Sequence, residues 1–174
     1  MNLIFLHGAP GVGKRTVAQE LSEALGFPFL NTHHLGELLE PVFGYGSENF
    51  NGLRDDVFTR LVTAATDLPE EGLIISFIYD TAFSPDIFSP FIDAAREHGS
   101  TALFIGLTCD DDELQARADE TGHGTEIRGT QASLADLPGP SITINTSGES
   151  AAETVENILM LLPNDLKKRQ LDML

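Results

Sequence analysis

Short apolar runs alternate along the chain with longer segments whose apolar residues recur three or four positions apart. The apolar runs predict five strands, at residues 3–6, 27–30, 73–79, 101–107 and 141–144. The run over 73–79 is mostly apolar, as expected for a central strand of a parallel sheet that is covered on both faces. The pattern therefore predicts a sheet with helices on both sides.

The segments with helical spacing predict helices that connect and follow these strands. They are expected at residues 16–25, 35–43, 50–64, 86–98, 110–120 and 150–162. Gly26 closes the first helix, and the three aspartates at 110–112 suit the positive end of a helix dipole. Strands that alternate with helices in this way imply a parallel sheet sandwiched between helices.

Residues 121–140 interrupt this alternation and are rich in glycine, threonine and polar residues. Long insertions in a compact fold are often lids or binding loops, and an ordinary surface loop is the alternative. No internal repeat or low-complexity linker divides the sequence. We therefore expect a single domain over residues 1–174.

A glycine-rich sequence, G-A-P-G-V-G-K-R-T, follows the first expected strand and opens the first expected helix. It contains the G-x-x-x-x-G-K motif in the strand-to-helix setting of a phosphate-binding loop. The glycines let backbone N–H groups turn inward around a phosphate, and the helix N-terminus faces the same anion. Lys14 adds a positive charge for the outer phosphates. The residues expected to bind nucleotide are Gly8, Ala9, Pro10, Gly11, Val12, Gly13, Lys14, Arg15 and Thr16.

The residue after the lysine departs from the usual motif. A serine or threonine normally stands there and ligates magnesium. This chain has Arg15 instead and places Thr16 one position later. Adenylate kinases have the same shift, so the loop resembles theirs more than that of GTPases or motor ATPases. We expect Thr16 to bind the metal directly or through water, and Arg15 either to support phosphate or to project into solvent.

The balance of charge is strongly acidic. The 174 residues include 27 acidic and 10 basic side chains, for a formal net charge of −17. Such a surface repels nucleic acid and anionic lipid, and it favours an acceptor with little negative charge. Solubility or a salt-rich habitat is the alternative explanation of the acidity.

Other features restrict the setting in which the protein works. Cys109 is the only cysteine, which excludes an internal disulfide and suits a reducing cytoplasm. The first residues lack a basic leader and an extended apolar stretch, and no apolar run approaches the ~20 residues that span a membrane. We therefore expect a cytoplasmic protein without a membrane segment.

Further motifs follow the phosphate loop in the order found in P-loop kinases of small molecules. Residues 31–34 read N-T-H-H, and residues 107–117 read L-T-C-D-D-D-E-L-Q-A-R. Together with the loop over 8–18, the apolar third strand and the final strand and helix, they resemble adenylate and other nucleoside monophosphate kinases, shikimate kinase and chloramphenicol phosphotransferase. The similarity covers nearly the whole chain and is closest to short members of that superfamily classed under the AAA name.

This resemblance implies an α/β fold, a three-layer sandwich around a five-stranded parallel sheet of order 2-3-1-4-5, as in P-loop NTPases. It also implies a substrate-binding helical region at about residues 31–70 and an ATP lid at about residues 118–140.

Two arginines fall where such kinases carry lid residues. Arg117 stands where these kinases begin the lid with an arginine that lies against adenine or phosphate, and Arg128 where a second cation reaches the transferring phosphate. Guanidinium groups suit both tasks because they bind phosphate oxygens in pairs and stack on rings. The alternative for Arg117 is a surface pair with Asp110 or Glu113 at helical spacing.

The acceptor side lacks the aspartate that related kinases place just past the second strand. His33 and His34 stand there, with Glu37 one helical turn after His33. Histidine accepts a proton near neutral pH, and Glu37 would orient it. We expect these three residues to bind or activate the acceptor. The alternative is that one histidine caps the helix and the other packs against phenylalanines.

Two more residues complete the candidate site. Asp80 follows the third strand, at the sheet edge that faces the ligand in parallel folds, where a carboxylate would hold magnesium through water or act as the base. A loop-capping role is its alternative. Arg54 would bind an anionic group of the acceptor, and its alternative is a salt bridge with Asp55 or Asp56.

The sequence favours an ATP-dependent, magnesium-dependent kinase of a small molecule, acting as a monomer or homodimer. The catalytic residues expected are Lys14, His33, Asp80, Arg117 and Arg128. A nucleotide-binding switch or weak NTPase without an acceptor is the alternative. The acidic charge disfavours a kinase of nucleic-acid ends.

Overall fold

The structure is a computed structural model, and it describes residues 1–174 except 69–70, 78–86, 122–136, 138, 165 and 167–174. The described residues contain one parallel sheet in which the strands stand in the order β2-β3-β1-β4-β5. The strands are β1 (Asn2–His7), β2 (Phe29–Asn31), β3 (Gly72–Ser76), β4 (Ala102–Thr108) and β5 (Ser141–Asn145). The order implied by the sequence resemblance is confirmed.

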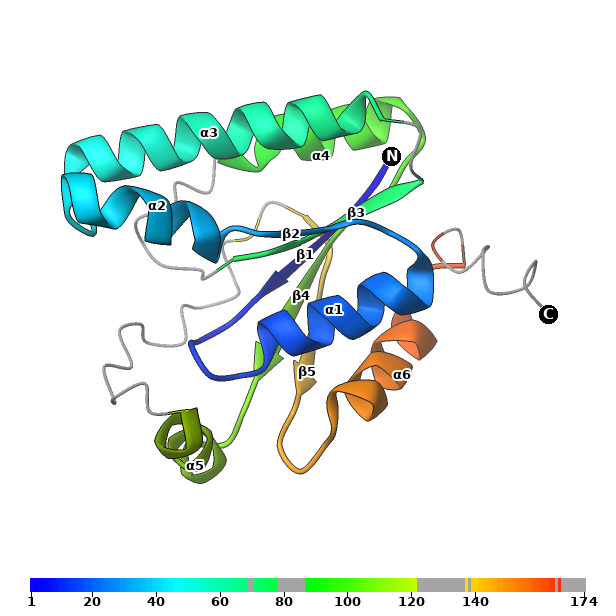
Figure 1. Ribbon diagram of the computed structural model, residues 1–174. Coiled ribbons are helices and arrows are strands. Elements are labelled where there is room, and N and C mark those ends of the chain that lie inside the picture. The colour runs from blue at the N-terminus through cyan, green and yellow to red at the C-terminus, as the bar shows by residue number, and fades with distance from the viewer. Residues whose placement is uncertain (69–70, 78–86, 122–136, 138, 165, 167–174) are drawn as a thin grey trace.

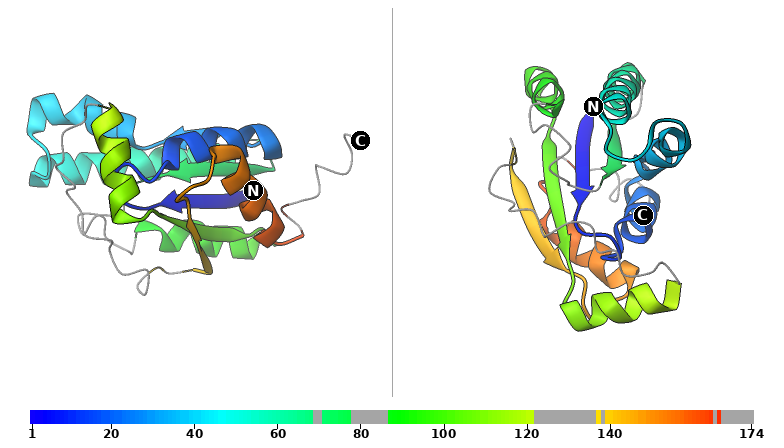
Figure 2. Two further views of the ribbon diagram at one scale, coloured as in Figure 1. Left: turned by 90° about the horizontal axis from the view of Figure 1, so that it is seen from below. Right: turned by 90° about the vertical axis from the view of Figure 1, so that its left-hand side faces the viewer.

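Helices cover both faces of this sheet, as Figures 1 and 2 show. They are α1 (Lys14–Leu25), α2 (His33–Phe43), α3 (Glu48–Thr66), α4 (Ser89–Glu97), α5 (Asp111–Thr121) and α6 (Ala151–Leu161). Helices α1 and α6 pack on one face, whereas α3 and α4 pack on the other. Helix α2 leaves the end of β2 and turns back into α3, and α5 lies beyond the end of β4 (Figure 1). The expected three-layer sandwich is present.

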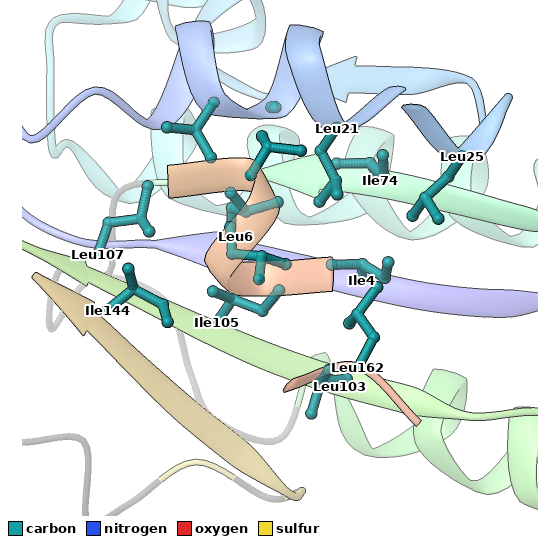
Figure 3. Packing of buried hydrophobic residues seen from close by; sticks show 14 of the residues in the cluster. Ile4, Leu6, Leu21, Leu25, Ile74, Leu103, Ile105, Leu107, Ile144 and Leu162 are labelled. Carbon is teal, nitrogen blue, oxygen red and sulfur yellow. The ribbon is translucent and has the colours of Figure 1, made fainter. Parts of the chain in front are cut away.

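The core divides into two clusters because successive residues of each strand point to opposite faces of the sheet. Ile4 and Leu6 of β1 join Leu21 of α1 and the buried face of α6 in one cluster, which Figure 3 shows at close range. Leu3 and Phe5 face the other way and pack with residues of α3 and α4. This second cluster is rich in phenylalanine. The central strand is thus fixed on both sides, which makes the end of β1 a rigid support.

Local sequence accounts for several of the helix boundaries. Gly26 takes a left-handed conformation (φ 67°) and ends α1, with its N–H bonded to the carbonyl of Ser22. The hydroxyl of Ser47 accepts the N–H of Phe50 at the start of α3. At the start of α6 the Ser150 and Glu153 side chains each bond the other's backbone N–H, which is a capping box.

The elements agree in kind and order with those expected, and they differ at some ends. Helices α1 and α2 each begin two residues earlier than the apolar spacing indicated, because Lys14, Arg15, His33 and His34 are polar first-turn residues that the spacing does not register. The third strand ends at Ser76, short of the expected end. Part of the expected segment 86–98 lies outside the described residues, and α4 occupies its later part.

All five strands end at the same edge of the sheet because they are parallel. Their last residues are His7, Asn31, Ser76, Thr108 and Asn145. In open α/β sheets this carboxyl edge is where ligands bind. Among the described residues, no helix combines the length and apolar character needed to cross a membrane.

Candidate nucleotide-binding site

The glycine-rich loop joins β1 to α1 at the carboxyl edge of the central strand (Figure 1). Gly8, Gly11 and Gly13 have φ angles of 147°, 85° and 94°. Side chains with a Cβ rarely adopt such angles, so the loop depends on glycine at these positions. A loop with glycines at such angles that leads directly into the N-terminus of a helix, here α1, is the kind of segment that binds phosphate through backbone N–H groups.

Neighbouring elements hold this loop in place from outside. A Cβ added to Gly8 would lie 2.3 Å from the carbonyl oxygen of Leu107 in β4. A Cβ on Gly11 would lie 2.9 Å from the Cδ1 atom of Leu114 in α5. The Val12 side chain is buried in the core. The loop is therefore a packed part of the fold with a fixed shape.

Lys14 bends back over the loop from the first turn of α1. Its ammonium donates hydrogen bonds to the carbonyl oxygens of Gly8 (2.8 Å) and Ala9 (2.7 Å). Burial lowers the pKa of Lys14 from 10.5 to about 8. The group still carries its charge at neutral pH. A nearby anion would stabilise the charged form, which makes this ammonium well suited to bind triphosphate oxygens.

His7, the last residue of β1, is buried directly before the loop. Its ring stacks on Phe77 with 5.7 Å between centroids. Burial and, to a lesser extent, the charge of Lys14 lower the pKa of His7 from 6.5 to about 4. The imidazole is therefore neutral at pH 7, and it does not add to the positive charge at the loop. Sequence reasoning did not select it, although a histidine immediately before the first loop glycine was a visible signal.

The two residues after Lys14 are exposed on the first turn of α1. Arg15 projects into solvent, which is one of the two arrangements expected from the sequence. Its charge nevertheless acts on the acceptor side, because it is one of the groups that lower the pKa of Glu37. Thr16 is exposed beside the loop, and its role as a magnesium ligand stays a prediction.

Arg117 of α5 lies over the end of the phosphate loop. The site where a Cβ of Gly13 would stand is 3.9 Å from its Nη1 atom. Its guanidinium donates to the Thr146 hydroxyl (3.1 Å), to the Thr146 carbonyl oxygen (2.8 Å) and to the carboxylate of Glu113. The pairing with Glu113 that the helical spacing allowed is present. It fixes the guanidinium beside the loop, and contact of Arg117 with adenine or phosphate stays a prediction.

Thr146 links three parts of the site and was not identified from the sequence. The residue is buried just past β5, and its hydroxyl lies 3.1 Å from the carbonyl oxygens of Val12 and Thr108. Glu113 accepts the N–H of Gly148 (2.8 Å) in the same turn. The loop after β5 is thus tied to the phosphate loop and to α5. Only tertiary structure brings residues 134 positions apart together, so no local pattern signals this contact.

His33, His34 and Glu37 come together on the exposed first turn of α2. The Nδ1 atom of His34 is 2.9 Å from Glu37, and the Nε2 atom of His33 is 3.5 Å from the other carboxylate oxygen. The hydrogen bond from His34, followed by the charge of His33, lowers the pKa of Glu37. The expected grouping is therefore present. Neither histidine is buried among phenylalanines, because both side chains are more than 60% exposed.

Residues other than these histidines anchor the start of α2. The side-chain oxygen of Asn31 accepts the N–H of His33 (3.1 Å) and lies 3.3 Å from the hydroxyl of Ser76. The Thr32 hydroxyl and N–H both donate to the carbonyl oxygen of Ser76 (2.9 and 3.1 Å). These bonds hold the first turn of α2 at the ends of β2 and β3, and the imidazoles stay accessible.

Arg54 lies in the interior of the α2–α3 region. Its side chain is 7% exposed, and its Nε and Nη2 atoms contact one carboxylate oxygen of Asp55 at 2.9 and 2.8 Å. The guanidinium also lies over the Phe50 ring, 5.9 Å from the centroid. The salt bridge given as the alternative role is therefore present, and acceptor binding by Arg54 stays a prediction.

The remaining predicted site residues, Asp80 and Arg128, lie outside the described residues, as does most of the expected lid. Within the part of the chain that the structure describes, no group of three or more His, Cys, Asp or Glu side chains is arranged to hold a metal ion.

Comparison with known proteins agrees with this geometry. A family model named AAA_18 and described as an AAA domain matches residues 4–133. A protein of Thermococcus kodakarensis named "Putative adenylate kinase" is 28% identical over 177 residues, which cover 96% of this chain and 89% of the relative.

Solved kinase structures share the fold at low sequence identity. A gluconokinase from Sinorhizobium meliloti 1021 has a TM-score of 0.62 at 18% identity and covers 99% of this chain and 95% of its own. The APS kinase of Mycobacterium tuberculosis, in complex with AMPPNP and APS, has a TM-score of 0.57 at 17% identity and covers 96% and 97%. The chain belongs to the AAA_18 family of AAA domains, and it has the fold of the P-loop kinases.

Proposed function

We propose that this protein is an ATP-dependent kinase that transfers a phosphoryl group to a hydroxyl of a small molecule. The observation that carries the proposal is the phosphate loop, with three glycines at positive φ and the Lys14 ammonium folded over it. The Thermococcus relative and the solved neighbours carry kinase names, which supports the same reaction class. We also propose that residues 1–174 form a single domain.

The loop and α5 would form the donor side. Backbone N–H groups and Lys14 bind the β- and γ-phosphates, and Arg117 adds a fixed guanidinium close to Gly13. Because Glu113 and Thr146 already orient Arg117, little side-chain entropy is lost when nucleotide binds. Neutral His7 leaves the charge of the loop to Lys14 and α1.

Few protein ligands are proposed for magnesium at this site. Thr16 offers a hydroxyl on the first turn of α1, and Asp80 is the proposed carboxylate. Magnesium usually binds one or two protein oxygens together with substrate phosphates and keeps several waters. When bound, it would neutralise charge on the transferring phosphates.

The start of α2 would form the acceptor side. During transfer the bond between the γ-phosphorus and the bridging oxygen breaks, a bond to the acceptor oxygen forms, and ADP leaves. The hydroxyl proton must go to a base. His33 is the proposed base, Glu37 holds its ring, and His34 binds the acceptor nearby. Asp80 is the alternative base, and Arg128 is proposed to reach the transferring phosphate.

A transfer screen tests this function. Radiolabelled ATP with magnesium is incubated with nucleosides, nucleoside monophosphates, shikimate, sugars and aminoglycoside or phenicol drugs, and labelled products are separated from phosphate. We expect at least one labelled acceptor, and its formation should be lost in Lys14→Ala. Arg96→Ala is the matched control. Arg96 is an exposed cation, and the described contacts pair it with Asp93 at the surface.

The outcomes distinguish the kinase from the switch or weak NTPase. Labelled inorganic phosphate that depends on Lys14, with no labelled acceptor, would favour the NTPase. Equal label transfer by the wild type and Lys14→Ala would identify a contaminating kinase and contradict the proposal.

A further inference from the structure

We infer that the phosphoryl acceptor carries no phosphate or carboxylate group and is a neutral or cationic alcohol; this inference rests on the proposed function. It separates this chain from an enzyme that phosphorylates adenylate, which is the reaction in the name of its Thermococcus relative. The inference depends on where the basic side chains of the described residues are used.

Two of the described basic residues, Lys14 and Arg117, lie at the phosphate loop. A third, Arg15, is exposed on the first turn of α1, and its charge already acts on the carboxylate of Glu37, whose pKa it helps to lower. A fourth, Arg96, pairs with Asp93 in the last turn of α4. Because α4 leads into β4, its last turn lies at the edge of the sheet opposite to the phosphate loop. The acceptor region at 31–68 is left with two basic residues.

Arg54 is the first of these two, and its charge is already balanced. It donates twice to one oxygen of Asp55, at 2.8 and 2.9 Å, while its side chain is only 7% exposed. The ring of Phe50 packs against the same guanidinium. To bind an anionic acceptor, Arg54 would have to leave a short ion pair in a desolvated position, which is unfavourable.

Arg60 is the second, and its place in α3 sets it away from the phosphate loop. Phe58 and Val62, two residues before and two after it, are buried in the core, and Arg60 is exposed on the outer side of the helix. Helix α3 ends at Thr66, and β3 begins at Gly72, so the last turns of α3 lie toward the amino edge of the sheet (Figure 1). The phosphate loop follows the carboxyl end of β1, so Arg60 lies away from the edge where transfer would occur.

Acidic groups dominate the same region. Between residues 31 and 68 the acidic side chains are Glu37, Glu40, Glu48, Asp55, Asp56 and Asp67. Glu37 lies close enough to the first turn of α1 for the charge of Arg15 to help lower its pKa. Both imidazoles face this carboxylate, at 3.5 Å for His33 and 2.9 Å for His34, so an anionic ligand that approached them would also meet Glu37. Phosphate and carboxylate are normally bound by forked or clustered cations, and the described acceptor region presents the opposite charge.

The first experiment uses protein saturated with AMPPNP and magnesium, with saturation verified by calorimetry. Failure of this loading would refute the nucleotide site itself, so it is recognised before any acceptor is added. AMP and inorganic phosphate are then titrated while backbone amide NMR shifts are recorded. We expect no saturable shifts at the α2 amides up to millimolar concentrations. Saturable binding of AMP or phosphate at α2 would overturn the inference.

The second experiment compares acceptors in matched pairs: adenosine with AMP, methyl shikimate with shikimate, and glucose with gluconate. Wherever transfer is measured, we expect kcat/KM to favour the uncharged member by about tenfold or more, which corresponds to one unfavourable charge contact. A preference for the anionic member would overturn the inference. If none of the pairs is phosphorylated, the AMP titration alone decides.

Glu37→Gln and Glu40→Gln provide a matched pair of variants, since both remove one exposed carboxylate from α2. We expect Glu37→Gln to raise the anionic-to-neutral kcat/KM ratio, or the AMP affinity of loaded protein, by several-fold. Glu40→Gln should leave both quantities as in the wild type. Equal effects of the two variants would show that net charge and not the acceptor site is responsible, and would contradict the inference.

Discussion

Lys14 combines a buried ammonium with a pKa of about 8, so its charge is maintained near neutral pH but is lost under mildly alkaline conditions. The cause is burial, which removes water from the charged form. Between about pH 8 and 10.5 the unfolded chain binds more protons at this group than the folded chain does. The titration of Lys14 should therefore increase the free energy of unfolding as the pH rises through that window.

Nucleotide binding should show the opposite pH dependence. A bound triphosphate favours the charged lysine, so binding above pH 8 must be accompanied by proton uptake. We predict that AMPPNP affinity falls above about pH 8, by up to tenfold for each pH unit. Calorimetry from pH 7 to 9.5 in buffers of different ionisation enthalpy measures both affinity and proton uptake. A constant affinity without proton uptake over that range would contradict the Lys14 pKa.

His7 gives a stability prediction on the acid side. Its folded pKa of about 4 lies below the unfolded value of 6.5, so the unfolded chain binds more protons between these values. The contribution of His7 to the free energy of unfolding is therefore fully present above pH 6.5, and it is lost as the pH falls toward 4. Between pH 7 and pH 5 the loss should be about 2 kcal/mol.

The measurement is urea unfolding of the wild type and His7→Gln at pH 7 and pH 5. The difference between the two pH values should shrink by about 2 kcal/mol in the variant, since glutamine does not titrate. An unchanged difference would mean that other groups cause the acid sensitivity.

Individual residues of the site differ in how far the sequence reveals them. The loop residues were predictable because their chemistry depends on short spacing, and the His33–Glu37 grouping followed from helical periodicity. Thr146 was not predictable, because its contacts join segments far apart in the sequence. For Arg54 the sequence indicated an ion pair with Asp55 or Asp56 as one of two roles, and the structure shows the pair with Asp55. The burial of His7 likewise depends on its stacking with Phe77, which no local pattern encodes.

At the scale of elements, the strands and helices are positioned by close contacts that a single Cβ would disturb. Gly72 begins β3, and a Cβ there would lie 2.2 Å from the ring of buried Phe27. Gly52 stands exposed within α3 and has nothing within 4 Å of its would-be Cβ. The same substitution should thus have opposite effects at these two glycines.

We predict that Gly72→Ala destabilises the protein by about 1–3 kcal/mol, because the ring and strand must separate. Gly52→Ala should stabilise it by about 0.5–1 kcal/mol through helix propensity. Thermal unfolding of both variants with the wild type measures the two changes. Destabilisation by both substitutions, or by neither, would contradict the packing described for β3 and α3.

Arg117 tests whether α5 contributes to nucleotide binding. We predict that Arg117→Ala weakens AMPPNP binding by about tenfold or more, since a charge-assisted hydrogen bond contributes about 1.5–3 kcal/mol. Arg96→Ala, which removes an exposed surface cation, should bind as the wild type does. Equal affinities in Arg117→Ala and the wild type would leave Arg117 with a structural role alone.

Element boundaries were less predictable than element order. Order followed from hydrophobic periodicity, because alternating strands and helices admit few right-handed parallel arrangements. The ends of helices depend instead on polar first-turn residues and on caps such as Ser150 and Glu153. The start of α2 shows this most clearly, since Asn31 and Ser76 fix it through bonds between two strand ends.

At the scale of the whole molecule, the sheet order brings the phosphate loop, α2 and α5 to one edge of the sheet. Central β1 pairs with β3 on one side and β4 on the other, so these groups converge although they are distant in sequence. The fold was predictable from a family resemblance, but the acceptor was not. The same sheet serves many reactions, and a fold alone does not identify the acceptor.

The central claim is that the loop from Gly8 to Thr16 binds a nucleoside triphosphate, and one calorimetric comparison tests it most directly. AMPPNP with magnesium is titrated into the wild type and into Lys14→Ala, both shown to be folded by circular dichroism. We predict saturable binding to the wild type and affinity reduced by about 100-fold or more in the variant, as for loss of a main electrostatic donor. Absence of binding to the wild type, or equal affinity in both proteins, would contradict the account.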